Sequence, residues 1–239
     1  MLRTTLRMQA HCPTSLFYGL AVGTLFLACS TPGSVIPASS TKPLAENVVQ
    51  IQGNVFTGSS QGDASLAMAP DGRTALVWNS KRQERGTFGI FARLFSATGQ
   101  PLSQELHINT YLPQAQWQPA AAFSADSNLW IAWESFGQDG SGAGLVARSL
   151  NSDGAAVGGE IAVNEQREGD QSQVVLVASG ADAMLAVWAS HFQAADGSTI
   201  AGLRARLLHT DAALAGVEIT LSDVTGDRRP AICALPEGG

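Results

Sequence analysis

The sequence predicts an all-β fold built from a repeat of about 55 residues, close to the period of known propeller repeats. Three tryptophans set this period: the interval from Trp78 to Trp133 equals that from Trp133 to Trp188, and a serine follows each two positions later. Charged residues make up only 14% of the chain, and the 25 glycines indicate many turns. Each unit contains four short runs separated by turn residues. We therefore expect a β-propeller-like array of four-stranded blades, with three complete blades and partial blades at both ends.

Residues 1–28 have the pattern of a signal peptide. Arg3 and Arg7 give the chain a positive start, and the uncharged apolar run 16–28 is short for a membrane span. This run ends in the letters LFLAC, which resemble a bacterial lipobox, so we expect lipidation of Cys29. The alternatives are ordinary secretion with cleavage nearby, or a buried apolar segment.

Residues 29–45 are predicted to be a tether between the lipid and the folded part, because they are rich in Ser, Thr and Pro. Ser30 follows the cysteine where an aspartate would favour inner-membrane retention. Resemblance to lipoprotein sorting rules then implies the outer membrane or the cell surface. The net charge of −6 disfavours a nucleic-acid partner. Cys233 is the cysteine that remains after processing and lipidation, so we expect no disulfide framework.

The repeat region covers residues 46–239. Its units lie at about 62–117, 118–171 and 172–229, with a partial unit at 230–239. In unit two we expect strands at 118–125, 129–135, 144–150 and 160–164. The run around each tryptophan is continuously apolar, as in a strand covered on both faces, so the tryptophans are interpreted as core residues.

An arginine and a glutamate recur at one fixed separation in every unit, centred on its last turn. Equal distances from a turn place two residues opposite each other on one face of a hairpin. We therefore predict three cross-strand pairs, each contributing roughly 0.2–1 kcal/mol. The pairs are Arg93 with Glu105, Arg148 with Glu160, and Arg206 with Glu218. The functional alternative is a ring of ligand-binding arginines.

Both ends of the chain are predicted to lie inside blades. Residues 48–56 occupy the place of the outer strand of a preceding blade, and residues 229–239 align with the first strand of a fourth unit. Three complete blades do not close a ring, since propellers have about four to eight. We therefore expect a truncated product or a fragment of a longer propeller. The alternative is that several chains complete one ring together.

Unit two resembles the propeller-type repeats of large bacterial exported and cell-surface proteins. The likeness lies in the segments WESFGQDGSG at 133–142, GLVAR at 144–148 and GGEIAVN at 158–164. It extends over roughly residues 46–239, with unit three the most divergent. The resemblance implies β-propeller architecture and surface display, and it implies no single activity.

Catalytic and metal motifs give no positive prediction. Sialidase-type Asp boxes have the pattern S-x-D-x-G-x-x-W, but Trp78 lies too far from its preceding glycine and Asp126 lacks that glycine. The glycine-rich segment 137–144 lies between strands and not before a helix, which disfavours a nucleotide site. Asp139 and Asp196 have oxygens suited to calcium, yet we interpret both as turn residues. We expect no cofactor and no metal.

Two functions follow from these observations. The favoured one is a non-enzymatic surface lipoprotein, held at the membrane by its lipid anchor. It would bind a protein or glycan ligand through blade loops or serve as a scaffold, with self-association if other chains complete the ring. The alternative is the propeller fragment of an exported, glycosidase-like hydrolase whose catalytic parts lie in missing sequence.

Overall fold

The computed structural model describes residues 51–84, 87–180, 183–194, 196–209, 216–223 and 229–233. The chain divides into two compact units, 1–57 and 58–239, and every described strand lies in the second. The predicted signal peptide, Cys29 and the tether fall outside the described residues, so export and lipidation stay predictions. In the described part of the chain, no helix is long and apolar enough to cross a membrane.

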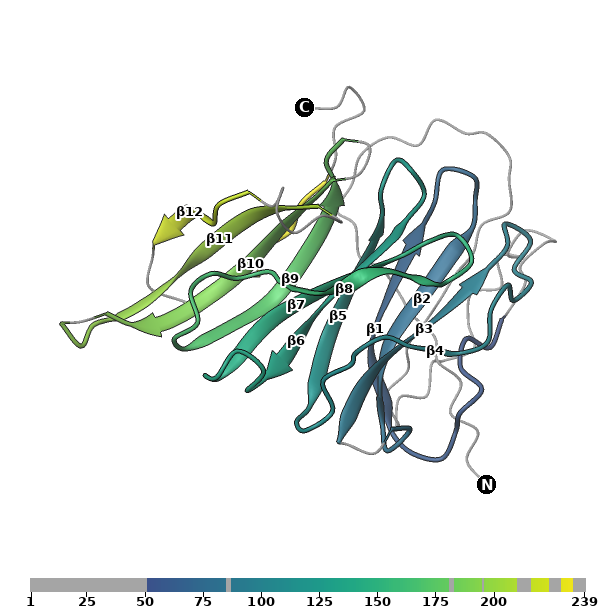
Figure 1. Cartoon of the computed structure of the whole chain (residues 1–239), viewed down its shortest axis with the longest axis horizontal. Coiled ribbons are helices and arrows are strands. Elements are labelled where there is room, and N and C mark those ends of the chain that lie inside the picture. The colour runs from purple at the N-terminus through teal and green to yellow at the C-terminus, as the bar shows by residue number, and fades with distance from the viewer. Residues whose placement is uncertain are drawn as a thin grey trace, which may run out of the picture. The chain divides into compact units, whose positions relative to one another are not determined.

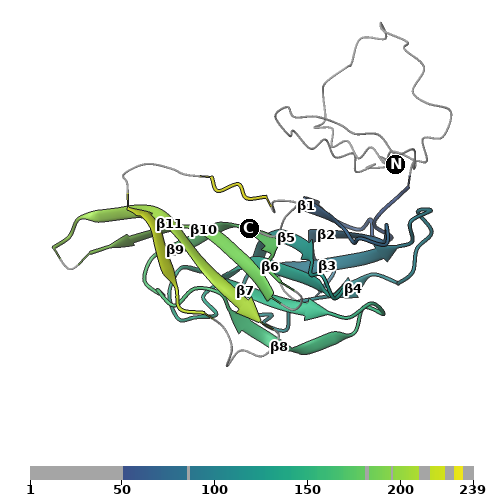
Figure 2. The same ribbon diagram turned by 90° about the horizontal axis from the view of Figure 1, so that it is seen from above.

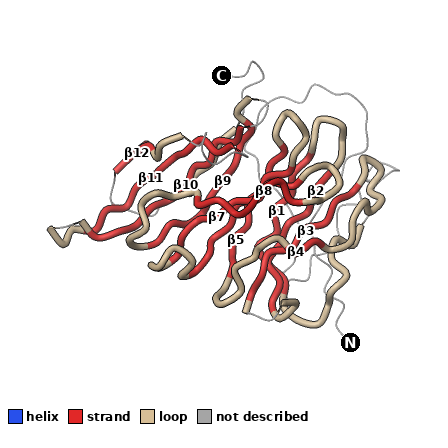
Figure 3. Tube along the Cα trace, in the orientation of Figure 1, coloured by secondary structure: helices blue, strands red, loops and turns tan. Residues whose placement is uncertain are grey.

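The described strands form three four-stranded antiparallel sheets, each with its strands bonded in chain order (Figure 1). Blade one contains β1 (Gln61–Met68), β2 (Thr74–Lys81), β3 (Phe88–Phe95) and β4 (Leu106–His107). Blade two contains β5 (Gln116–Phe123), β6 (Leu129–Phe136), β7 (Ala143–Leu150) and β8 (Ala156–Ala162). Blade three contains β9 (Asp170–Ala178), β10 (Ala183–Gln193), β11 (Thr199–His209) and β12 (Ile219–Asp223). Figure 3 shows strands and loops only, with no helix in the described residues.

The predicted all-β, propeller-like array of four-stranded blades is confirmed. In blade two, the expected runs at 129–135 and 144–150 coincide with β6 and β7 to within a single position at each end. The last strand begins at Ala156 and not at residue 160, because the residues just after the turn already pair with the end of β7. Of the expected partial blades, residues 51–57 and 229–233 are described, and they contain no strand.

Successive blades pack face to face (Figure 2). A hydrophobic core lies between each neighbouring pair. Ile131 and Trp133 of β6 contribute to the core shared with blade one, while Trp130 and Ala132 contribute to the core shared with blade three. Alternate residues of one strand therefore fill two different cores. This explains why the run around each tryptophan is apolar without interruption.

The three regularly spaced tryptophans are buried, and two of them bond to the first strand of their own blade. Trp133 Nε1 donates to Gln116 Oε1 at 2.8 Å, and Trp188 Nε1 donates to Gln171 Oε1 at 3.1 Å. Both glutamines are fully buried. A buried amide needs such a partner, so each bond ties the start of the first strand to the second strand.

A β-bulge interrupts the first strand of every blade at one repeat position. Asp63, Gln118 and Gln173 have φ values of 44°, 44° and 57°, and the pairing register shifts beside each of them. Bulges redirect nearby side chains and end regular pairing. In each blade the bulge lies near the start of the first strand. The second strand ends, and the third begins, at the same end of the sheet. We call this end of the three sheets the entry edge.

Candidate functional site

Residues beside the predicted arginine–glutamate pairs lie opposite each other in the sheets, and in blade two the register shifts directly after Ala147, at Arg148. The pairs Ala92↔Leu106, Ala147↔Ile161 and Ala205↔Ile219 each lie one step from a predicted pair. In blade one, Arg93 Nε donates to the Ser103 carbonyl at 3.2 Å, and Glu105 accepts from Gln83 Nε2 at 2.6 Å. Both side chains of blade one therefore also bond to other groups of their own blade.

In blade two, these side chains bond to the outer end of blade one. Arg148 Nη1 donates to the Ile108 carbonyl at 2.7 Å. Glu160 accepts a hydrogen bond from the backbone N–H of Thr110, and a second from Gln138 Nε2 at 2.8 Å. The guanidinium and the carboxylate thus link two blades through backbone groups.

Blade three repeats this linkage and corrects one predicted partner. Arg206 Nη1 donates to the Val163 carbonyl at 3.2 Å, and its ion pair, at 3.1 Å, is with Glu165 and not with the predicted Glu218. Glu218 instead accepts from the backbone N–H of Glu165 at 2.6 Å and makes a longer, 3.8 Å ion pair with Arg204. An arginine side chain is long enough to reach the neighbouring blade, where carbonyl acceptors are available. These arginines therefore serve blade packing more than ligand binding.

The two aspartates considered for calcium stabilise turns. Asp139 Oδ1 accepts from the Ser141 N–H at 3.1 Å, and Asp196 Oδ1 accepts from the Ser198 N–H at 2.9 Å. The hydroxyl of Ser198 also donates to Asp196, and this bond holds the pKa of the exposed Asp196 below its ordinary value. Among the described residues, no group of three or more His, Cys, Asp or Glu side chains is arranged to hold a metal ion.

An aromatic pocket of about 500 Å³ opens at the entry edge, between blades one and two. Trp117 at the start of β5 and Phe88 at the start of β3 lie with their ring centroids 4.4 Å apart and their planes at 36°. Phe136, the last residue of β6, is exposed beside them. The pocket is lined by Lys81, Thr87, Phe88, Pro113, Gln114, Ala115, Trp117 and Phe136.

Lys81 is the charged residue among the described residues that line the pocket, and its ammonium group lies over an aromatic ring. Its ammonium nitrogen is 5.4 Å from the centroid of Phe88, a cation–π distance. Gln114 adds an exposed amide at the rim. The pocket thus combines flat apolar surfaces with a few polar groups, which is the usual composition of a small-molecule site.

Carboxylates also lie at the entry edge, outside the set of residues that line the pocket. Glu134 of β6 is buried, and its Oε1 accepts from the backbone N–H of Gln173, the bulge residue of blade three, at 2.9 Å. Burial raises the pKa of Glu134, the Gln173 N–H opposes that rise, and the negative charges of Asp63 and Asp170 add to it. Glu134 is therefore a buried acid that holds its proton more tightly than an ordinary glutamate.

This raised pKa predicts a pH-dependent loss of stability that Glu134→Gln removes. Between the unfolded carboxyl pKa of about 4.3 and the raised folded pKa, the folded protein binds more protons than the unfolded chain. Stability from this group is therefore greatest at low pH and falls as pH rises through that window. Glutamine keeps the acceptor oxygen for Gln173, so the variant should unfold at a higher temperature than wild type at pH 7 and at an equal one at pH 3.5.

Thermal unfolding followed by circular dichroism between pH 3.5 and 7.5 measures this difference. Asp71→Asn is the control of opposite sign, because the side-chain hydrogen bond from Arg73 lowers the pKa of Asp71. The stability that the ionised Asp71 carboxylate contributes is present at neutral pH and is lost on acidification. A constant gap between Glu134→Gln and wild type across the pH range would contradict the assignment.

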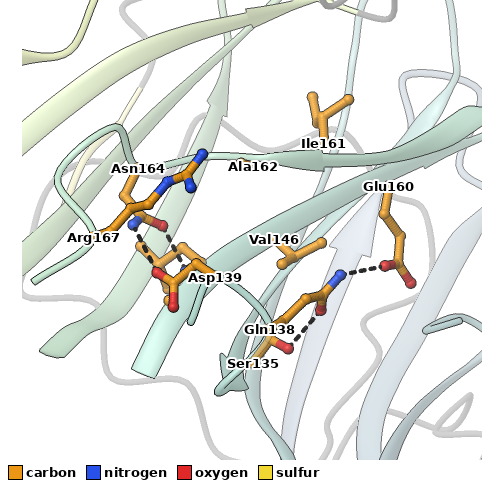
Figure 4. Close-up of a pocket in the computed structure, with 11 residues that line it drawn as sticks. Ser135, Gln138, Asp139, Val146, Glu160, Ile161, Ala162, Asn164 and Arg167 are labelled. Atoms are coloured by element: carbon orange, nitrogen blue, oxygen red, sulfur yellow. Dashed lines mark hydrogen bonds between the residues drawn. The ribbon is translucent and has the colours of Figure 1, made fainter. Parts of the chain in front are cut away.

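A second, polar cleft of about 240 Å³ lies on blade two between the β6–β7 loop and β8 (Figure 4). Gln138 bridges Ser135 and Glu160, accepting from Ser135 Oγ at 2.6 Å and donating to Glu160 at 2.8 Å. Asn164 accepts from the Leu145 N–H at 2.7 Å on its floor. These polar groups bind one another, so the cleft mainly anchors the loop against the outer strand.

The aromatic pocket was not expected from the repeat anchors, although the sequence holds a signal for it. The positions equivalent to Trp117 are Gly62 and Ser172 in the other two units, one repeat period away on either side. Unit two thus departs from the repeat by having a tryptophan at a position where the other two units have small residues. Such departures indicate function better than the anchors do, because the anchors recur to fill the cores.

No family model matches the chain, and no curated protein matches it either. A Dyadobacter fermentans protein of unknown function has a similar structure, with a TM-score of 0.51 and 13% identity over 74% of this chain. A Hadza microbial sialidase (TM-score 0.44, 13% identity, 68% of this chain and 37% of that one) is a more distant likeness. So is an endo-1,4-beta-xylanase from Bacteroides thetaiotaomicron (TM-score 0.43, 10% identity, 73% and 62%).

The chain spans 60% of the length of the Dyadobacter fermentans protein. At such low identities these likenesses concern the fold alone. The β-propeller-type architecture is defined by the three four-stranded blades themselves.

Proposed function

We propose that this protein is an exported, lipid-anchored and non-enzymatic propeller module that binds a glycan in the aromatic pocket. The carrying observation is the grouping of Phe88, Trp117 and Phe136 around one opening of about 500 Å³. The lipobox-like segment ending at Cys29 supports the anchor, and the tether that follows supports display away from the membrane.

Sugar rings fit the chemistry of this pocket. One face of many pyranose rings consists of C–H groups, which pack against the electron-rich face of an aromatic ring, while the hydroxyls around the rim take hydrogen bonds. Trp117 and Phe88 pack against each other and together form the aromatic surface of the pocket, and Gln114 and Lys81 supply polar groups at the rim. A pocket of about 500 Å³ has room for one or two sugar units.

A second candidate, the propeller part of an exported hydrolase, is favoured by one observation. Glu134 is a buried carboxyl with a raised pKa beside the charges of Asp63 and Asp170, and glycosidases use such an acid next to a carboxylate. In this structure Oε1 of Glu134 is engaged by the Gln173 N–H, so binding is the better supported role. Release of reducing sugar that is lost in Glu134→Gln would reverse this preference.

Replacing Trp117 with alanine is expected to weaken glycan binding at least tenfold, because it removes the largest stacking surface of the pocket. The Cys29→Ser chain, which we expect in the soluble extract and not in the membrane fraction, supplies unlipidated protein for titration. Its partition tests the anchor as well. Cellohexaose, xylohexaose and oligogalacturonate are suitable first probes, titrated by calorimetry and tryptophan fluorescence after an array screen.

The matched control is Leu102→Ala, an exposed apolar residue at the opposite end of blade one. It should bind as the parent chain does. Absence of binding to any arrayed glycan at millimolar concentration would overturn the proposal. Equal affinity in Trp117→Ala and the control would move the site away from this pocket.

A further inference from the structure

The lining of the aromatic pocket also departs from the repeat on blade one. Lys81, the last residue of β2, lies opposite Phe88, the first residue of β3. By strand register, the same place is taken by Phe136 and Ala143 in blade two and by His191 and Ala201 in blade three. Among the three described blades, the lysine–phenylalanine pair therefore occurs in blade one alone. A pair that does not recur is not needed to build a blade.

The side chain of Lys81 is held beside the aromatic surface. It is half-buried, and its ammonium nitrogen lies 5.4 Å from the centroid of the Phe88 ring, which itself packs against Trp117. An ammonium beside an aromatic ring gives up part of its hydration for a weak attraction. Among the described residues, no carboxylate forms an ion pair with Lys81. Its positive charge is therefore available to a ligand in the pocket.

The nearest acidic residue along the chain is directed away from the pocket. Glu84, which follows β2, pairs with His107 and accepts a hydrogen bond from Asn109 Nδ2 at 3.2 Å. Its carboxylate lies against Gly89. Neighbouring residues of a strand point to opposite faces, so Glu84 lies on the other face of β3 from Phe88. The described lining of the pocket contains no acidic residue and thus carries a net positive charge.

Three described carboxylates of the entry edge lie outside this lining, and each already accepts a hydrogen bond. Asp63 accepts from Asn79 Nδ2 at 2.6 Å, Asp170 accepts from the backbone N–H of Ala143 at 3.0 Å, and Glu134 accepts from Gln173 as described above. With the net charge of −6, these groups repel an anion at long range. Selectivity for an anion must therefore come from a short contact inside the pocket.

We propose that the aromatic pocket selects glycans that carry a carboxylate, and that Lys81 pairs with this group. The inference rests on the proposed glycan site. In a uronic acid the carboxylate is attached at the edge of the sugar ring, so a ring whose C–H face stacks on the aromatic surface directs it toward the rim. Lys81 lies at that rim. An ion pair beside aromatic rings is screened less by water than one on an open surface, which makes the contact selective.

Oligogalacturonate and its methyl-esterified form test this selectivity, because they have the same chain length and ring stereochemistry and differ in charge. The Cys29→Ser chain is titrated with each by calorimetry. We expect the acid to bind about tenfold more tightly than the ester, as for a hydrogen bond between charged groups. The difference should disappear in Lys81→Met, which keeps an apolar side chain over Phe88. It should persist in Arg82→Met, the matched control, because Arg82 is the adjacent, exposed cation and lies outside the lining.

The outcomes separate this inference from the proposed function. Equal affinity of the parent chain for acid and ester would overturn the role of Lys81 and leave the glycan site intact. Equal losses in Lys81→Met and Arg82→Met would also overturn it, because net charge alone would explain them. A loss in Lys81→Met that is the same for acid and ester would overturn it too, since the side chain would then only shape the pocket. Absence of binding to every arrayed glycan would overturn both proposals.

Discussion

Replacing Trp133 with alanine is expected to lower the free energy of unfolding by about 3–5 kcal/mol, the range found for large aromatic residues removed from a core. Trp133 is fully buried between blades one and two, so little of the cavity can be filled by solvent or by surface movement. The change also removes the donor to Gln116, a buried amide. An acceptor left without a partner adds about 1–3 kcal/mol. Urea unfolding of the Cys29→Ser chain, followed by circular dichroism, measures the loss.

The contribution of the hydrogen bond is separated by two Trp→Phe variants. Trp133→Phe leaves Gln116 without its donor, whereas Trp78→Phe removes an indole N–H that has no acceptor among the described residues. Both variants lose similar ring volume. Trp133→Phe should therefore be the less stable of the two by about 1–3 kcal/mol. Equal losses would show that the buried bond contributes nothing beyond packing.

Gly169→Ala is expected to cost about 4 kcal/mol or more, which is exceptional for a single methyl group. Gly169 precedes β9 with φ of +78°, a region that strains a residue with a side chain. A Cβ there would also meet the carbonyl oxygen of His191 and lie 2.8 Å from Phe192 Cα. These are backbone atoms of β10, so they have no rotamer through which to move away.

Gly180→Ala is the matched control for this change. Gly180 has a similar φ of +84°, and an added Cβ would meet nothing within 4 Å. This variant carries the backbone strain alone, about 1–2 kcal/mol. Thermal and urea unfolding of the two variants separates strain from collision. A loss at Gly169 no larger than that at Gly180 would contradict the close approach of β9 and β10.

The repeat made the blades predictable because the same positions must be buried in every unit. Trp78, Trp133 and Trp188 recur at one fixed interval because each is needed inside its blade, and the continuous apolar runs around them reflect burial on two faces. The turn-centred spacing likewise predicted which arginine pairs with which glutamate, but in blade three Arg206 forms its ion pair with Glu165. Spacing within one unit contains no information about the neighbouring blade, however, so the inter-blade partners of Arg148 and Arg206 could not be predicted.

The aromatic pocket was unpredictable for a related reason. Phe88, Trp117 and Phe136 come from three strands in two blades, and they meet because the entry edges of those blades are adjacent. No short motif joins residues that lie so far apart along the chain. The raised pKa of Glu134 also depends on the next blade, because burial is its main cause and the charge of Asp170 in blade three adds to it, although the N–H of Gln173 opposes the rise. Both features require knowledge of how one unit is placed against the next.

The bonds between blades have a consequence for how such a protein evolves. Arg148 and Glu160 reach back to backbone groups of blade one, and the outer end of blade two offers the equivalent backbone groups to Arg206 and Glu218. Blade two thus contains both sets of contact groups: side chains that bond to the preceding blade and backbone groups that bond to the following one. A tandem duplication of such a unit inserts a copy that can pack against both neighbouring blades through the same kinds of contact. Gene duplication can then add units to the array and deletion can remove them, while mutations at the entry edge change the residues around the aromatic pocket.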